Sequence, residues 1–164
     1  MNLPVNNPIV RNAPLEKIDL NKLFLELLEK KFEGYCHLTT LGKYGFEESI
    51  IILSKGRITG LIFLNPGYDI ELYGKDAVLF CFNTYAQPSG RLNIFGLTDD
   101  QVKLVLLFND KIKYSLSISE KKLPFKNLKY NEKLLDDLLS KKVAKEKSSK
   151  ELFNEFNLVD LTKE

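Results

Sequence analysis

The chain is 164 residues long, 44% of them hydrophobic and 28% charged, with a formal net charge of +2. This length suits a single hydrophobic core, and the composition excludes wholesale disorder. The near-neutral charge, with Arg11, Arg57 and Arg91 as the only arginines, argues against a dedicated nucleic-acid reader or an acidic partner selected by a global field.

The sequence also bears on cellular location. No stretch approaches the roughly 18 apolar residues that a membrane span requires. The N-terminus lacks the basic and apolar regions of a signal peptide. Cys36 and Cys81 each lie in an apolar run, where a free cysteine is usually a small buried hydrophobe. We therefore expect a cytoplasmic protein.

The first thirty residues indicate an arm followed by a helix. Prolines at positions 4, 8 and 14 predict that residues 1–18 form an extended arm lying against the core. Asp19 is a favourable N-cap, and apolar residues after it recur at helical spacing. This predicts a helix that ends near Lys31. The recurring residues are Leu20, Leu23, Phe24, Leu27 and Leu28.

A β-hairpin is the clearest feature of the middle of the chain. Residues 34–40, 46–54 and 57–64 are rich in the aromatic and β-branched residues typical of strands. Lys55-Gly56 predicts a tight turn between the second and third strands, because glycine accepts positive φ. Residues 50–53 and 61–64 are apolar on both faces, so the hairpin needs cover on both sides. Any part left uncovered would form an interface, to which we assign Ile50, Ile52, Ile62 and Phe63.

The remaining elements alternate between strands and helices. We expect a strand at 70–73, a mostly buried helix over 75–85 and a strand at 91–97. Thr98 and Gln101 match a capping box, which begins a helix ending near Asn109. Its apolar positions are Val102, Val105, Leu106 and Phe108. Residues 110–130 alternate as a strand would until Pro124 interrupts them. Helices capped by Asn131 and by Ser148 with Glu151 follow.

These elements predict an α+β fold. It consists of an N-terminal helix, an antiparallel meander sheet packed by helices, and a C-terminal helical segment. We expect one domain over residues 1–130, with its extended arm, and a helical extension over residues 131–164.

The order of these motifs resembles an archaeal domain family of unknown function. The resemblance rests on the Leu-Pro arm, on Phe32-Glu33-Gly34-Tyr35 and on the Lys55-Gly56 hairpin. It covers most of residues 1–110 and, loosely, the terminal helix. The chain is more distantly similar to the PATAN-type domains of bacterial two-component signalling proteins. The residues that carry this likeness are Phe32, Gly34, Gly56-Arg57-Ile58, Gly74 and Ala77. Both resemblances imply an adaptor role without catalytic residues.

The candidates for chemistry do not converge. Cys36 and His37 are adjacent in a strand and point to opposite faces, so they do not readily share a metal or act as nucleophile and base. Glu47 and Glu48 diverge in the same way, and we interpret them as a solvated pair. The glycine turns at 42–45 and 55–57 fit neither phosphate-binding motif. We therefore predict no catalytic residue, metal ligand or cofactor.

A lysine-rich segment provides the main alternative function. Residues 121–150 contain ten lysines and four acids, a composition that favours weak, salt-dependent binding of nucleic acid. The candidate contacts are Lys141, Lys142, Lys145 and Lys147. We predict a non-enzymatic interaction or adaptor module whose partner is another protein or a second copy of the chain. Nucleic-acid binding, and a small enzyme or ligand-binding domain, are the alternatives.

Overall fold

The computed structural model describes residues 3–116 and 128–140, and the chain divides into two compact units, Met1–Tyr130 and Asn131–Glu164. In the second unit the described residues include a helix over 133–140. The side chain of Asn131 caps this helix by accepting a hydrogen bond from the backbone N–H of Lys133 at 3.1 Å. The predicted cap at Ser148 and Glu151 lies outside the described residues.

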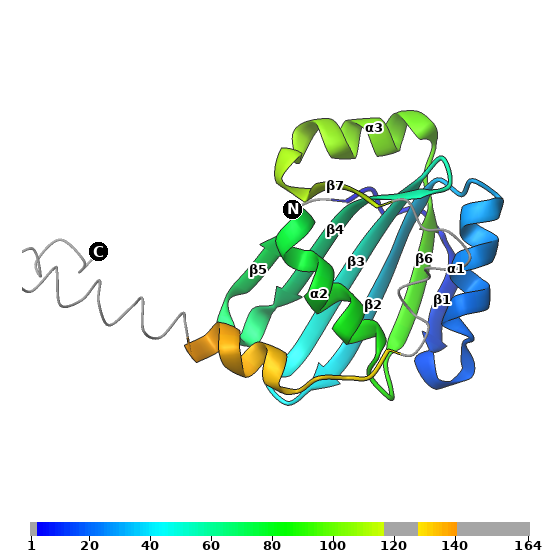
Figure 1. Ribbon diagram of the computed structural model, residues 1–164. Coiled ribbons are helices and arrows are strands. Elements are labelled where there is room, and N and C mark those ends of the chain that lie inside the picture. The colour runs from blue at the N-terminus through cyan, green and yellow to red at the C-terminus, as the bar shows by residue number, and fades with distance from the viewer. Residues whose placement is uncertain (1–2, 117–127, 141–164) are drawn as a thin grey trace, which may run out of the picture. The chain divides into compact units, whose positions relative to one another are not determined.

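The first unit is built on a sheet whose seven described strands pair antiparallel throughout (Figure 1). The strands follow the order β1-β6-β2-β3-β4-β5, and β7 pairs with β4 beside β5. Their bounds are β1 Pro8–Pro14, β2 Gly34–Gly42, β3 Gly45–Ser54, β4 Arg57–Asn65, β5 Ile70–Tyr73, β6 Arg91–Gly96 and β7 Lys113–Leu116. The predicted α+β fold is confirmed.

The β3–β4 hairpin turns where the sequence predicts. Ser54 pairs with Arg57, and the two residues between them have positive φ, 51° at Lys55 and 73° at Gly56. Positive φ at both central positions matches the twist of a two-residue hairpin. The backbone N–H of Lys55 also donates to the Glu33 carboxylate at 2.9 Å, which ties the turn to the segment before β2.

The N-terminal arm is more ordered than the sequence alone indicates. Residues Pro8–Pro14 form β1 and pair with β6, so the arm extends the sheet by one strand. Prolines are tolerated there because β1 is an edge strand whose outer side needs no ladder partner. The short 3₁₀ turn Leu15–Lys17 then leads to α1, Leu20–Glu29, where Asp19 accepts a hydrogen bond from Lys22 N at 3.0 Å. The predicted N-cap is confirmed.

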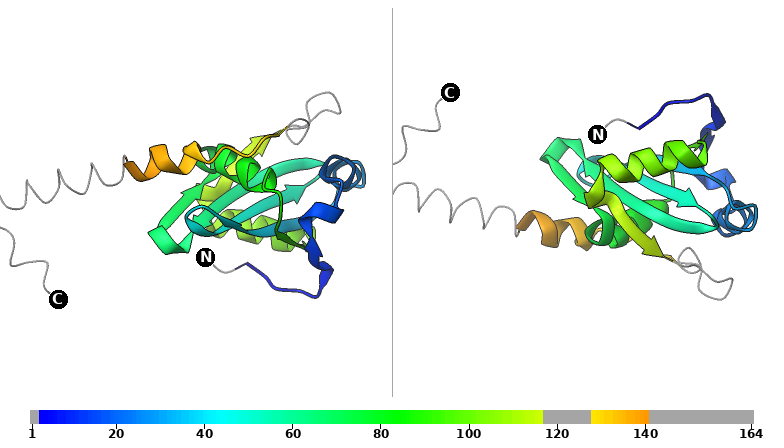
Figure 2. Two further views of the ribbon diagram at one scale, coloured as in Figure 1. Left: turned by 90° about the horizontal axis from the view of Figure 1, so that it is seen from below. Right: turned by 90° about the horizontal axis from the view of Figure 1, so that it is seen from above.

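Helices cover the two faces of the sheet unequally (Figure 2). One face, here the α2 face, is covered by α2, Gly74–Tyr85, which packs on β3 and β4 and buries Ala77 and Cys81. Helix α1 adds Phe24, which is fully buried and lies edge-on to Tyr85 with ring centroids 5.6 Å apart. On the other face, here the cavity face, α3, Asp99–Phe108, covers one end.

The hairpin surface that the sequence suggests as an interface is covered by the chain itself. Ile50, Ile52 and Ile62 lie on the cavity face in one apolar cluster with Val102 and Val105 of α3. Phe63 lies on the α2 face, against Phe80, with ring centroids 5.3 Å apart. All four proposed interface side chains are at most 8% exposed. Any interface must therefore use other residues.

Candidate functional site

The register of the sheet arranges the cavity face in rows, because directly opposed residues on antiparallel strands point to the same side. A middle row crosses five strands and is apolar at its centre. It consists of Asn93, His37, Ile50, Ile62 and Tyr73. The next row, here the polar row, lies farther from α3. It consists of Arg91, Thr39, Glu48, Leu64 and Glu71.

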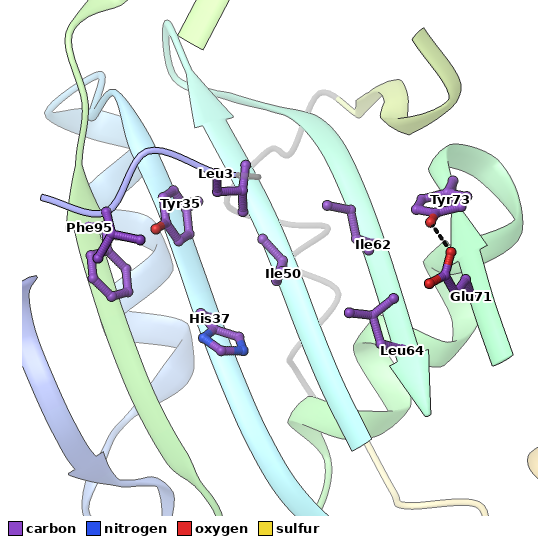
Figure 3. Close-up of a pocket in the computed structure, with 10 residues that line it drawn as sticks. Leu3, Tyr35, His37, Ile50, Ile62, Leu64, Glu71, Tyr73 and Phe95 are labelled. Atoms are coloured by element: carbon purple, nitrogen blue, oxygen red, sulfur yellow. Dashed lines mark hydrogen bonds between the residues drawn. The ribbon is translucent and has the colours of Figure 1, made fainter. Parts of the chain in front are cut away.

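Beside α3 the cavity face contains a hollow of about 400 Å³ (Figure 3). Its floor is Ile50, Ile62 and Leu64, and aromatic rings stand on either side of that floor. On one side Tyr35 stacks on Phe95 with ring centroids 4.8 Å apart, and on the other stands Tyr73. This volume and this mainly apolar lining are those of small-molecule sites in proteins.

Two polar pairs lie at opposite sides of the hollow. His37 Nε2 lies 3.0 Å from the Glu48 carboxylate, and each side chain is about one-third exposed. On β5, the Tyr73 hydroxyl donates to the Glu71 carboxylate, and this hydrogen bond raises the pKa of Tyr73. Lysine and arginine are absent from the described lining of the hollow. The carboxylates of Glu48 and Glu71 therefore dominate the charge of this part of the polar row.

The chain's own N-terminal residues border the hollow. Leu3 and Val5 line it, yet Val5 is 81% exposed. Two hydrogen bonds hold this segment: the Tyr35 hydroxyl donates to Pro4 O at 3.0 Å, and Asn6 Nδ2 donates to Gly96 O at 3.1 Å. The segment thus forms a wall of the hollow rather than a buried plug.

The predicted separation of Cys36 and His37 is found in the structure. His37 lies on the cavity face, whereas Cys36 and Cys81 are buried on the α2 face. Burial raises the pKa of both thiols to about 12, so neither is a ready nucleophile. Within the described residues there is no cluster of three or more His, Cys, Asp or Glu side chains that could hold a metal ion.

Glu47 and Glu48 diverge as expected, but the interpretation of a solvated pair is wrong. Glu48 pairs with His37, whereas Glu47 is 1% exposed on the α2 face. Burial raises the pKa of Glu47, and Gln87 and Thr84 nearby offset part of the rise. The Thr84 hydroxyl already donates to Phe80 O at 2.9 Å. A protonated Glu47 can therefore donate to Thr84, whereas an ionised one lacks that bond.

A second surface feature is an apolar stripe on the outer side of α3. Val102 and Val105 point to the core, and the opposite side exposes Leu104 by 50%, Leu107 by 67% and Phe108 by 79%. Sequence reasoning placed Phe108 among the apolar positions of this helix without showing that it faces solvent. Asp100 precedes these residues and Lys111 follows them, and both are exposed. We call these five residues the α3 stripe.

The predicted nucleic-acid contacts Lys141, Lys142, Lys145 and Lys147 lie outside the described residues. No helix in the described ranges is long and apolar enough to cross a membrane.

The fold and the hollow define a small antiparallel α+β domain with an apolar cavity on one sheet face. Residues 1–109 match the DUF2226 family, described as uncharacterized proteins conserved in archaea, and the chain belongs to this family. This confirms the archaeal resemblance over the residues that carry its motifs. No curated protein and no solved structure matches the chain.

Proposed function

We propose that the protein is a non-enzymatic interaction module that associates with a second copy of itself through the α3 stripe. The exposure of Leu104, Leu107 and Phe108 on one helix carries this proposal. Contiguous apolar side chains on the outside of a helix mark interaction sites more often than isolated ones do. The distant similarity to PATAN-type domains also supports an adaptor role.

The α3 stripe is self-complementary when two helices run antiparallel. Positions 100, 104, 107, 108 and 111 follow the i, i+4, i+7, i+8 and i+11 spacing of one helix side. A two-fold axis midway between Leu104 and Leu107 places each against the other in the partner copy. The same axis places Asp100 opposite Lys111. Such an isologous contact pairs apolar residues at the centre and opposite charges at the ends.

The size of the α3 stripe sets the expected strength. Five side chains of a ten-residue helix cover less than the roughly 800 Å² per partner of a standard interface. The dimer is therefore weak and concentration-dependent, with a dissociation constant above about 1 μM. Additional contacts at the dimer edge would strengthen it.

Sedimentation equilibrium over a range of concentrations tests this proposal. We expect the wild type to show a reversible monomer–dimer equilibrium and Leu107→Glu to be monomeric throughout. Leu79→Glu is the matched control, because Leu79 is a 68% exposed leucine on α2. The control should dimerise like the wild type. A wild type that stays monomeric at the highest concentration, or equal behaviour of the two variants, would reject the proposal.

The alternatives have weaker support. The nucleic-acid hypothesis depends on lysines outside the described residues and remains a prediction. An enzymatic reading would use His37 and Glu48, since a His–carboxylate pair is part of many general-base sites. The cysteines, however, are buried on the opposite face. The described residues therefore favour binding over catalysis.

A further inference from the structure

We infer that the hollow on the cavity face is a binding site for a small amphipathic cation, with an apolar body and an ammonium head. This site is separate from the α3 stripe and does not depend on self-association. The argument rests on the shape of the hollow, on its lining and on the charges at its rim.

The apolar body of such a ligand has a defined place. Ile50 and Ile62 are opposed across β3 and β4 and form the centre of the floor, with Leu64 one row away. Tyr35 with Phe95 and, on the other side, Tyr73 stand at the two ends of this floor (Figure 3). Neighbouring strands are about 4.8 Å apart, so a chain of about eight carbons reaches from the stacked rings to β5.

The head group meets negative charge. Glu71 is exposed on β5 at the rim, and the Tyr73 hydroxyl beside it donates to its carboxylate. Glu48 lies in the same row, with Leu64 between the two acids. Arg91, the cation of this row, is on β6 at the far end, with β2 between it and Glu48. An ammonium group thus finds carboxylates and an aromatic ring at one rim, whereas an anionic head meets like charge.

Three matched probes separate the effect of charge from that of apolar contact: n-octylammonium, octanoate and octanol, each used below its micellar range. Methyl NMR of the full-length protein, labelled at isoleucine, reports on Ile50 and Ile62 directly. We expect saturable shifts at both methyl groups with octylammonium. Octanoate should bind about tenfold more weakly, because attraction to the rim is replaced by repulsion.

Variants identify the carboxylate. Glu71→Gln should lower octylammonium affinity about three- to fivefold, the range of exposed charge pairs, and leave octanol unchanged. Tyr73→Phe frees Glu71 from its hydroxyl partner, so octylammonium should bind at least as well as to the wild type. Glu29→Gln, an exposed acid on α1, is the control and should change nothing.

The inference is overturned by any of three results. These are equal affinity for octylammonium and octanoate, shifts that never saturate, and saturable shifts that bypass Ile50 and Ile62. A Glu71→Gln protein that binds both charged probes as the wild type does would equally exclude the carboxylate as the reason for selectivity.

Discussion

Replacing Glu47 by Gln should stabilise the protein at neutral pH and leave its stability unchanged in acid. Glu47 is 1% exposed, and burial raises its pKa above the ordinary value of 4.5. As the pH rises from 4.5, the unfolded chain loses this proton while the native chain keeps it. The unfolded state is thereby favoured by about 1.4 kcal/mol for each pH unit, until the pH passes the raised native pKa.

Gln keeps the shape of the side chain and removes the titration. The free energy of unfolding of Glu47→Gln minus that of the wild type should be near zero below pH 4. It should then grow at up to about 1.4 kcal/mol per pH unit and level off above the native pKa. Urea unfolding followed by circular dichroism between pH 4 and pH 8 measures this difference, with Glu29→Gln as the control. A difference that is constant with pH, or that shrinks as the pH rises, would refute the reasoning.

Three further predictions concern the same domain. A Cβ at Gly42 would lie 2.1 Å from Glu47 Oε1, so Gly42→Ala should cost about 1–3 kcal/mol in urea unfolding; combining it with Glu47→Ala should cost less than the sum of the two single changes, and simple additivity would contradict the contact. Thr98→Ala removes the capping box of α3 and should lower the free energy of unfolding by about 1 kcal/mol, whereas an unchanged value would show that the cap contributes nothing. Cys36 and Cys81 should not react with a thiol reagent at pH 8 in the native state, because burial raises their pKa to about 12; labelling that is as fast as in urea would show that they are accessible.

Local signals in the sequence predict much of the fold. The caps at Asp19 and Thr98 and the turn at Lys55-Gly56 depend on neighbouring residues only, and all three occur in the structure. The alternation of side chains also separates Cys36 from His37 correctly, since it requires only that residues 34–40 form a strand.

The cavity could not be predicted in this way. Its walls come from the N-terminal arm and five strands, and alternation indicates which residues share a face of one strand but not which strands are neighbours. The burial of Glu47 depends on a similar long-range event. The glycine at position 42 leaves room for its carboxylate, and Gln87 and Thr84 at the end of α2 approach it.

The exposed stripe on α3 was hidden for a different reason. Helix α3 has apolar residues on more than one side, so periodicity does not decide which side meets the sheet. The structure assigns Val102 and Val105 to the core and leaves Leu107 and Phe108 in solvent. An apolar pattern around a helix thus identified the element but not its exposed surface.

The most direct test of the interaction proposal is a charge exchange between the two ends of the α3 stripe. Asp100→Lys and Lys111→Asp each place like charges opposite one another in the antiparallel dimer, and each alone should weaken the association measured by sedimentation equilibrium. The double variant restores opposite charges in reversed order and should recover wild-type association. If the double variant associates no better than the single variants, the antiparallel α3 contact is wrong.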